Sequence, residues 1–136
     1  MKADRVRKVA DLANRRTRER FGRFLIEGPQ SVREAVTWMP DAVRDLYVQA
    51  VDGPDGPRIA GETLTSIVER SQEHRIYVHP ASEAVMRRIS PDCQGIAAVG
   101  DADAVRATAQ GTQWPEKPFV AAFWQVRDPG NAGTVI

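Results

Sequence analysis

Residues 24–39 read FLIEGPQSVREAVTWM, a short apolar run that is followed at once by a helical pattern. The run Phe24–Ile26 stops at a Glu-Gly-Pro sequence, which is typical of a buried strand that leaves a sheet. Pro29 favours the first turn of a helix, and Ser31 is a candidate N-terminal cap. Apolar residues then recur at three- and four-residue spacing as far as Met39. The stretch therefore predicts a strand, a tight turn and a helix in succession.

The same alternation continues on both sides of this stretch. An amphipathic helix is expected from Val6 to about Ala13, and the sequence Asp52–Pro57, with two Gly-Pro pairs, predicts a surface loop. Further strands are predicted at residues 43–49, 76–78 (stopped by Pro80) and 95–99, and further helices at residues 59–71 and 82–89. Four strands that alternate with helices predict an α/β fold, a three-layer αβα domain with a four-stranded mixed or parallel sheet, largely parallel if the alternation decides.

The composition is that of an ordinary globular domain. The chain has 136 residues, of which 42% are hydrophobic and 27% charged, and this balance argues against intrinsic disorder. No apolar run approaches the ~20 residues that span a bilayer, and no signal-peptide core follows the N-terminus. Because Cys93 is the single cysteine, no internal disulfide can form, and a cytoplasmic location is the simplest expectation.

Basic residues are concentrated at the N-terminal end. Residues 1–23 contain nine basic and three acidic side chains, a net charge of +6, while the remainder of the chain carries −5. Arginines outnumber lysines 16 to 3, which favours bidentate contacts to phosphate, although a biased genome composition explains part of that ratio. Two interpretations remain open for this cluster, contact with RNA and a solvated helix flank. The arginines concerned are Arg15, Arg16, Arg18, Arg20 and Arg23.

The turn at residues 27–33 is a second candidate for RNA contact. It joins the first strand to a helix, a place where backbone amides are exposed to phosphate or to a flipped base. The alternative is plain helix capping by Ser31. The residues of interest are Glu27, Gly28, Gln30, Ser31 and Arg33.

The sequence does not favour a metal site or a cysteine nucleophile. His74 and His79 are expected to be surface residues, and the chain contains neither a CxxC nor an HExxH motif. Cys93 stands in no signature context and is expected to be an ordinary buried or half-buried thiol.

The C-terminal part has a different character. Residues 101–117 predict a linker with no more than a helical turn, and residues 119–124 predict a fully apolar strand. The turn at residues 128–134, with Asn131 between two glycines, resembles a ligand-binding turn of an α/β fold, but it is not a Walker A motif. A buried-type strand with nothing to pack against suggests a fragment of a longer protein; the alternative is that residues 119–124 join the edge of the first sheet.

Several of these segments together resemble one family. The chain is similar to the SpoU/TrmH family of RNA 2′-O-ribose methyltransferases of the SPOUT (trefoil-knot) superfamily. The resemblance lies in residues 9–20, residues 22–28 (GRFLIEG), residues 32–35 (VREA), residues 94–99 (QGIAAV) after Ile89-Ser90, and the strand at 119–126 with the turn at 128–134. In place of the family's usual residues before Gln-Gly, this chain has Pro91-Asp92-Cys93.

The resemblance implies a division into parts. Residues 1–100 would form an RNA substrate-binding domain similar to kink-turn-binding ribosomal proteins, residues 101–117 a linker, and residues 118–136 the truncated start of a trefoil-knot methyltransferase domain. In that fold the junction at residues 27–33 touches structured RNA, either ribosomal or transfer RNA. Asn131 would correspond to a supporting catalytic asparagine, and the catalytic arginine would follow Ile136.

The same resemblance implies S-adenosylmethionine as the cofactor of the full-length enzyme and a homodimer formed through the catalytic domain. The 136-residue chain itself is predicted to be inactive and to bind neither cofactor, metal nor membrane. Two other functions remain open. One is a stand-alone RNA-binding adaptor of the kink-turn-binding type, and the other is a small phosphate-binding enzyme that uses the turn at 128–134.

Overall fold

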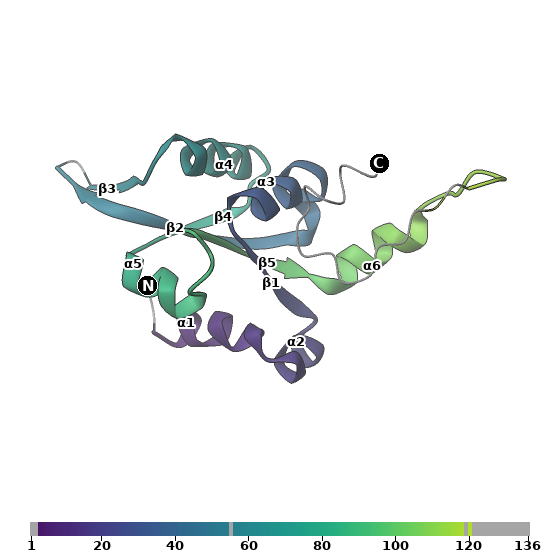
Figure 1. The fold of residues 1–136 in the computed structure, drawn as a ribbon, viewed down its shortest axis with the longest axis horizontal. Helices are drawn as coiled ribbons and strands as arrows, with labels where there is room; N and C mark the ends of the chain where they lie inside the picture. The colour runs from purple at the N-terminus through teal and green to yellow at the C-terminus, as the bar shows by residue number, and fades with distance from the viewer. Residues whose placement is uncertain (1–2, 55, 119, 121–136) are drawn as a thin grey trace.

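The computed structural model describes residues 3–54, 56–118 and 120. Its helices are α1 (Ala3–Ala10), α2 (Arg15–Phe21), α3 (Pro29–Trp38), α4 (Glu62–Glu73), α5 (Glu83–Ile89) and α6 (Ala102–Gly111), with short 3₁₀ turns η1 (Asp11–Ala13) and η2 (Pro40–Ala42). Its strands are β1 (Arg23–Glu27), β2 (Val43–Gly53), β3 (Gly56–Ile59), β4 (Tyr77–Ala81) and β5 (Ile96–Asp101). The strands form one sheet between two helical layers, α3 and α4 on one face and α1 and α5 on the other (Figure 1). This confirms the predicted α/β class.

The sheet is mixed rather than largely parallel. The strand order is β1-β5-β2-β3, and β4 pairs with β2. β5 is antiparallel to both β1 and β2, while β2 and β4 are parallel. Since β5 lies between β1 and β2, those two strands run in the same direction, as helical crossovers require. The expectation of a largely parallel sheet is wrong because the last strand of the domain enters the middle of the sheet in the opposite direction.

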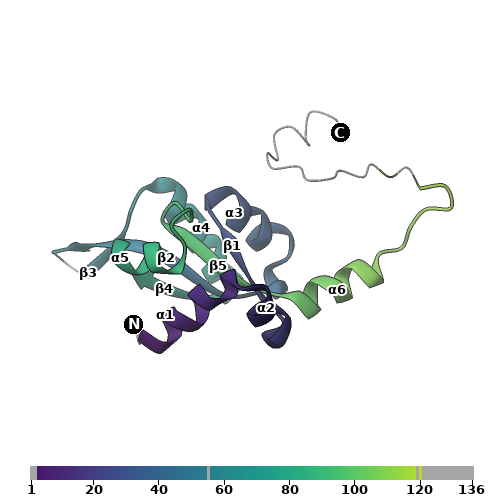
Figure 2. The same cartoon turned by 60° about the horizontal axis from the view of Figure 1, so that its bottom comes forward.

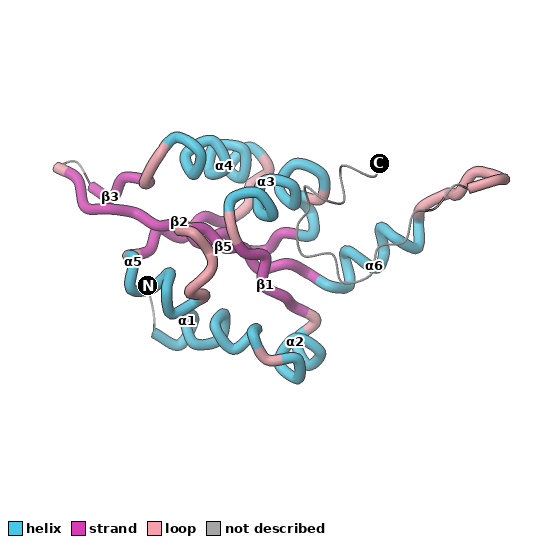
Figure 3. The backbone as a smooth tube through the Cα atoms, viewed as in Figure 1, coloured by secondary structure: helices cyan, strands magenta, loops and turns pink. Residues whose placement is uncertain are grey.

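A fifth strand replaces part of the predicted loop at residues 52–57. β2 continues to Gly53, and β3 pairs with it in an antiparallel hairpin whose register joins Gly53 to Gly56 and Asp52 to Pro57 (Figure 3). Proline is tolerated there because β3 lies at the end of the strand order, where no further strand needs its missing N–H. For the same reason Pro80 does not stop β4, which runs to Ala81 beside β2 alone.

Alternation along the central strands builds two separate hydrophobic cores. Leu46 and Val48 of β2 face α3 and α4, whereas Tyr47 between them faces α1 and α5. All three side chains are almost completely buried. β5 follows the same rule, with Ile96 and Ala98 on one side and Ala97 and Val99 on the other. Both faces of these strands are apolar because a helical layer covers each of them.

The region after β5 is more helical than the sequence indicated. Residues 102–111 form α6, which buries none of its side chains and projects away from the sheet (Figures 1 and 2). Its alanines and Val105 favour a helix, but they form no apolar stripe strong enough to predict one. Whether this segment is a linker stays a prediction. The predicted strand at 119–124 and the turn that contains Asn131 lie outside the described residues, apart from Val120.

Candidate nucleic-acid interface

The arginine-rich segment forms a short helix of its own, α2, between two capping residues. The side-chain oxygen of Asn14 accepts a hydrogen bond from the backbone N–H of Arg16 (2.9 Å). Gly22 ends the helix in the left-handed conformation, with φ 59°. Asparagine at the N-cap and glycine after the last turn are the residues that most favour helix ends. The sequence pattern showed only a break here because α2 buries none of its side chains and so has no apolar stripe.

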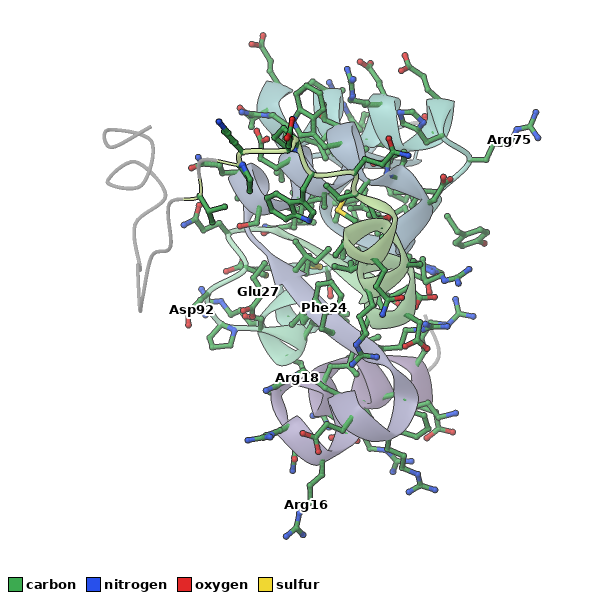
Figure 4. All side chains as sticks on the ribbon, turned by 90° about the vertical axis from the view of Figure 1, so that its right-hand side faces the viewer. Arg16, Arg18, Phe24, Glu27, Arg75 and Asp92 are labelled. Atoms are coloured by element: carbon green, nitrogen blue, oxygen red, sulfur yellow. The ribbon has the colours of Figure 1, made fainter. Side chains whose placement is uncertain are left out.

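Three of the predicted arginines lie on α2, and each has at most a weak partner for its positive charge. Arg15 donates to the carboxylate of Glu19 at 2.7 Å in a pair exposed to solvent, and such pairs contribute about 0–1 kcal/mol. The guanidinium carbon of Arg20 lies 5.3 Å from the centroid of the exposed Phe21 ring. Arg16 forms no ion pair with the described residues and points away from the body (Figure 4). These guanidinium groups are therefore accessible to phosphate.

Arg18 is different because part of its guanidinium is used inside the protein. Its Nη1 donates to the backbone carbonyls of Leu12 (3.0 Å) and Ala13 (2.7 Å), at the end of η1. Carbonyls at a helix end have no partner within the helix, so an arginine there stabilises the turn. Arg18 therefore has a structural role and a fixed direction.

The fifth predicted arginine, Arg23, pairs with a buried carboxylate. Its Nη1 lies 2.7 Å from the Asp101 carboxylate, which also accepts from Arg44 Nε (2.9 Å). The same carboxylate caps α6 by accepting from the N–H groups of Asp103 (3.0 Å) and Ala104 (3.3 Å). The Arg44 hydrogen bond, helped by the two backbone donors and by Arg23, lowers the pKa of Asp101 to about 2. We call Arg23, Arg44 and Asp101 the Asp101 clamp; it gives Arg23 a partner within the protein.

The junction between β1 and α3 is built on a glycine. Gly28 has φ 84° and precedes the helix, and its N–H donates to the carbonyl of Ile96 in β5 (3.1 Å). Pro29 occupies the first helical position, where its missing N–H costs nothing. The helix therefore begins before Ser31, and the prediction of a Ser31 cap is wrong.

The predicted residues of this junction do not all lie together. Arg33 lines a hollow of about 290 Å³ between α3 and α4, beside Glu69 and Glu73. Glu27, at the end of β1, lines a different depression on the edge of the sheet. Arg33 and Glu27 therefore line different depressions of the surface.

A groove of about 480 Å³ brings the two predicted segments together along β1. Arg18 comes from α2, Phe24 and Glu27 come from β1, and Pro91 and Asp92 come from the loop that precedes β5 (Figure 4). We call it the β1 groove. From the sequence, Phe24 is expected to offer a stacking face beside the arginines, whereas sequence reasoning missed Pro91 and Asp92 as members of a site. Only the antiparallel pairing of β1 with β5 brings that loop beside residue 27, and no local pattern reveals this pairing.

His79 is buried, which contradicts its expected place on the surface. Its Nε2 lies 2.7 Å from the carboxylate of Asp45, and its Nδ1 lies 3.3 Å from the guanidinium of Arg5. Its ring stacks on Tyr47 with the centroids 4.7 Å apart. Burial, together with the Asp45 charge, raises the pKa of Tyr47 to about 12. These contacts tie α1 to β4, whereas His74 is exposed as expected.

Cys93 is buried, as expected, and its Sγ lies 3.7 Å from the carbonyl of Met86. Within the described ranges, no three His, Cys, Asp or Glu side chains gather closely enough to hold a metal ion. In the same part of the chain, every helix is too short or too polar to cross a bilayer.

Comparison with known proteins assigns the domain. A family model described as the MRM3-like substrate binding domain matches residues 3–98. The chain belongs to this family. The match begins with α1 and ends within β5, so it includes α2, β1 and the β1 groove.

Solved structures of methyltransferases have the same fold. They include an rRNA methyltransferase from Sinorhizobium meliloti, with a TM-score of 0.52 and 16% identity over 73% of this chain and 34% of that one. The SpoU methyltransferase AviRb from Streptomyces viridochromogenes, solved with AdoMet, has a TM-score of 0.52 and 21% identity over 74% of this chain and 36% of that one. A protein from Porphyromonas gingivalis, assigned to the TrmH family of RNA methyltransferases, has a TM-score of 0.54 and 22% identity over 99% of this chain and 46% of that one.

These findings confirm the resemblance noted in the sequence. Residues 3–98 form an MRM3-like substrate binding domain, and the mixed five-stranded α/β fold is shared with these structural neighbours. The chain spans between 34% and 46% of the length of the three structures. A comparison with curated protein sequences gives no match.

Proposed function

We propose that this MRM3-like domain holds structured RNA for an S-adenosylmethionine-dependent RNA 2′-O-ribose methyltransferase. The observation that carries the proposal is the position of α2. This helix carries exposed arginines and contributes Arg18 to the β1 groove, within the part of the chain that the substrate-binding family model matches. The expected similarity to kink-turn-binding ribosomal proteins supports the same role for residues 27–33.

The chemistry explains why such an enzyme needs a separate RNA-holding domain. A ribose 2′-hydroxyl is a weak nucleophile, and transfer of a methyl group requires it to stand in line with the donor sulfonium. Fixing two reactants in that geometry can contribute on the order of 7–11 kcal/mol. A surface that binds RNA through many phosphate contacts helps to fix this geometry without taking part in the bond-making step.

Other parts of the proposal concern residues and partners outside the described domain. The cofactor, when bound, would supply the methyl group, and Asn131 is proposed as a supporting residue of the catalytic domain. We also propose that the enzyme acts as a homodimer through that domain. Residues 101–117 would then connect the two domains, and the Asp101 cap would fix where α6 starts.

The test compares two variants that remove the same charge. In the α2 variant, Arg15, Arg16 and Arg20 become glutamine; in the control, glutamine replaces three exposed arginines elsewhere, Arg58, Arg70 and Arg75. The full chain is titrated with a structured RNA at several salt concentrations, followed by fluorescence anisotropy. We expect the α2 variant to bind more weakly and the magnitude of its salt slope to fall by about 0.7–0.9 for each phosphate that the variant no longer neutralises. Equal affinity of the two variants would remove α2 from the interface.

A further inference from the structure

We propose that the β1 groove binds one unpaired guanine of the RNA, an inference that rests on the proposed RNA-binding function. Side chains cannot read the deep, narrow major groove of an RNA helix, so proteins recognise bases mainly where they are unpaired. The groove measures about 480 Å³, which is within the usual size range of small-ligand sites. The groups that border it decide which base fits.

Two carboxylates stand on one side of the groove. Glu27 closes β1, and Asp92 lies in the loop before β5, next to Glu27 in Figure 4. The Asp92 loop is held in place because the backbone N–H of Asp92 donates to Ser90 Oγ (3.2 Å). Both carboxylates are exposed, and neither forms an ion pair or a side-chain hydrogen bond with the described residues. They are therefore acceptors without a partner.

A fixed guanidinium completes the groove. Arg18 makes both of its internal bonds through Nη1, to the carbonyls of Leu12 and Ala13, and its Nε and Nη2 donate to none of the described residues. Those bonds hold the side chain before any ligand arrives, so less conformational entropy is lost on binding. Arg18 can then offer a pair of parallel N–H donors.

The strand between these groups provides apolar surface and further polar groups. The ring of Phe24 packs against Gly100, where only a glycine leaves room for it. The N–H of Gly28 donates to the carbonyl of Ile96, and the carbonyl of Gly22 accepts from the N–H of Ala102. The backbone N–H and C=O groups of the even-numbered residues of β1 therefore point toward β5. By alternation, the N–H and C=O of Leu25 point to the open edge, beside the groove.

Guanine matches this arrangement better than the other RNA bases. Its O6 and N7 form an acceptor pair that arginine binds in a bidentate contact. Its N1–H and N2–H groups form a donor pair that suits a carboxylate. Adenine and cytosine offer a single amino group, and uracil offers a single N–H, so none of them satisfies both sides of the groove at once.

The test uses hairpin RNAs that carry one unpaired nucleotide, which is guanosine, inosine, adenosine, cytidine or uridine. Anisotropy titrations with the full chain measure the affinity for each. We expect guanosine to bind tightest, by about tenfold over adenosine and uridine, with inosine weaker because it lacks the N2 amino group. The double variant Glu27→Gln, Asp92→Asn should bind all five RNAs alike, while its matched control Glu69→Gln, Glu73→Gln should retain the preference.

A second variant separates recognition from folding. Arg18→Lys keeps the charge and loses the bidentate fork, so we expect it to lower the guanosine preference without abolishing RNA binding. Equal affinity of the unaltered chain for all five hairpins would overturn the guanine site while leaving the proposed RNA-binding function intact. A guanosine preference that survives the Glu27 and Asp92 substitutions would also overturn it. Failure to bind any of these RNAs would overturn both.

Discussion

The two ends of β1 use arginine in opposite ways. At the first end, Arg23 is neutralised by the buried Asp101 carboxylate together with Arg44. Towards the other end, Arg18 lies across the β1 groove from two free carboxylates and keeps donors available. A strand of five residues thus separates an internal ion cluster from a surface that is open to a ligand.

This difference shows that a count of charges overstates the binding surface. The sequence places nine basic residues in the first 23, yet some of them make contacts within the fold that use all or part of their guanidinium groups. Arg5 contacts His79, Arg18 closes η1 and Arg23 neutralises Asp101. Of the five arginines in residues 15–23, those left exposed for contact with RNA are Arg15, Arg16 and Arg20 on α2.

The largest effect is expected from removing the carboxylate of the Asp101 clamp. Asp101→Ala removes the partner of Arg23 and Arg44 together with the cap of α6, and it leaves two cations facing each other. We expect this variant to have the lowest Tm of the series, because it removes the charge-assisted hydrogen bonds to the arginines and the N-terminal cap of α6 at once. Thermal unfolding followed by circular dichroism measures it. If the Tm stayed that of the unaltered chain, the clamp would not be a structural element.

Gly100→Ala tests the middle of the strand. A Cβ at residue 100 would lie 2.7 and 2.8 Å from the Cε atoms of Phe24, which faces it across the β1–β5 pair. The ring must move, and overpacking of this kind costs about 1–3 kcal/mol. Denaturant titration gives the free energy of unfolding. The combined variant Gly100→Ala, Phe24→Leu should recover part of the loss, and a lack of recovery would contradict the steric explanation.

Acid provides a milder way to open the clamp. The pKa of Asp101 is lowered from 3.8 to about 2 by its hydrogen bond from Arg44. A depressed carboxyl pKa contributes stability that is fully present above pH 3.8 and is lost as the pH falls through about 2. We expect Asp101→Asn to remove this part of the acid dependence. Parallel Tm-against-pH curves for the two proteins between pH 4 and 2 would refute it.

The sequence predicts local units well because local patterns encode them. The apolar run at 24–26, the Gly28-Pro29 turn and the periodic apolar residues of α3 fold as expected, since each depends on neighbours in the chain. The positions of α4 and α5 are likewise predicted by the spacing of their apolar residues, although α4 begins at Glu62 rather than at residue 59.

Pairing between distant segments is what the sequence conceals. The β1–β5 register that sets Phe24 against Gly100 and Glu27 against Ala97 depends on residues far apart in the chain. Both the antiparallel position of β5 in the mixed sheet and the β1 groove follow from it, and no local pattern predicted either of them. The burial of His79 has the same origin, because its contacts come from α1 and β2 rather than from adjacent residues.

The smallest effects distinguish two neighbouring arginines of α2. Arg18→Ala loses the hydrogen bonds to Leu12 and Ala13 and should lower the free energy of unfolding by about 1 kcal/mol. Arg16→Ala, whose side chain points into solvent (Figure 4), should change it by less than about 0.5 kcal/mol. Chemical denaturation of the two single variants measures both changes. Binding should show another pattern, since both variants weaken RNA affinity but only Arg18→Ala reduces the discrimination between guanosine and adenosine. Equal stability and equal discrimination in the two proteins would mean that Arg18 is simply another exposed cation, and the contrast between the ends of β1 would then rest on Arg23 alone.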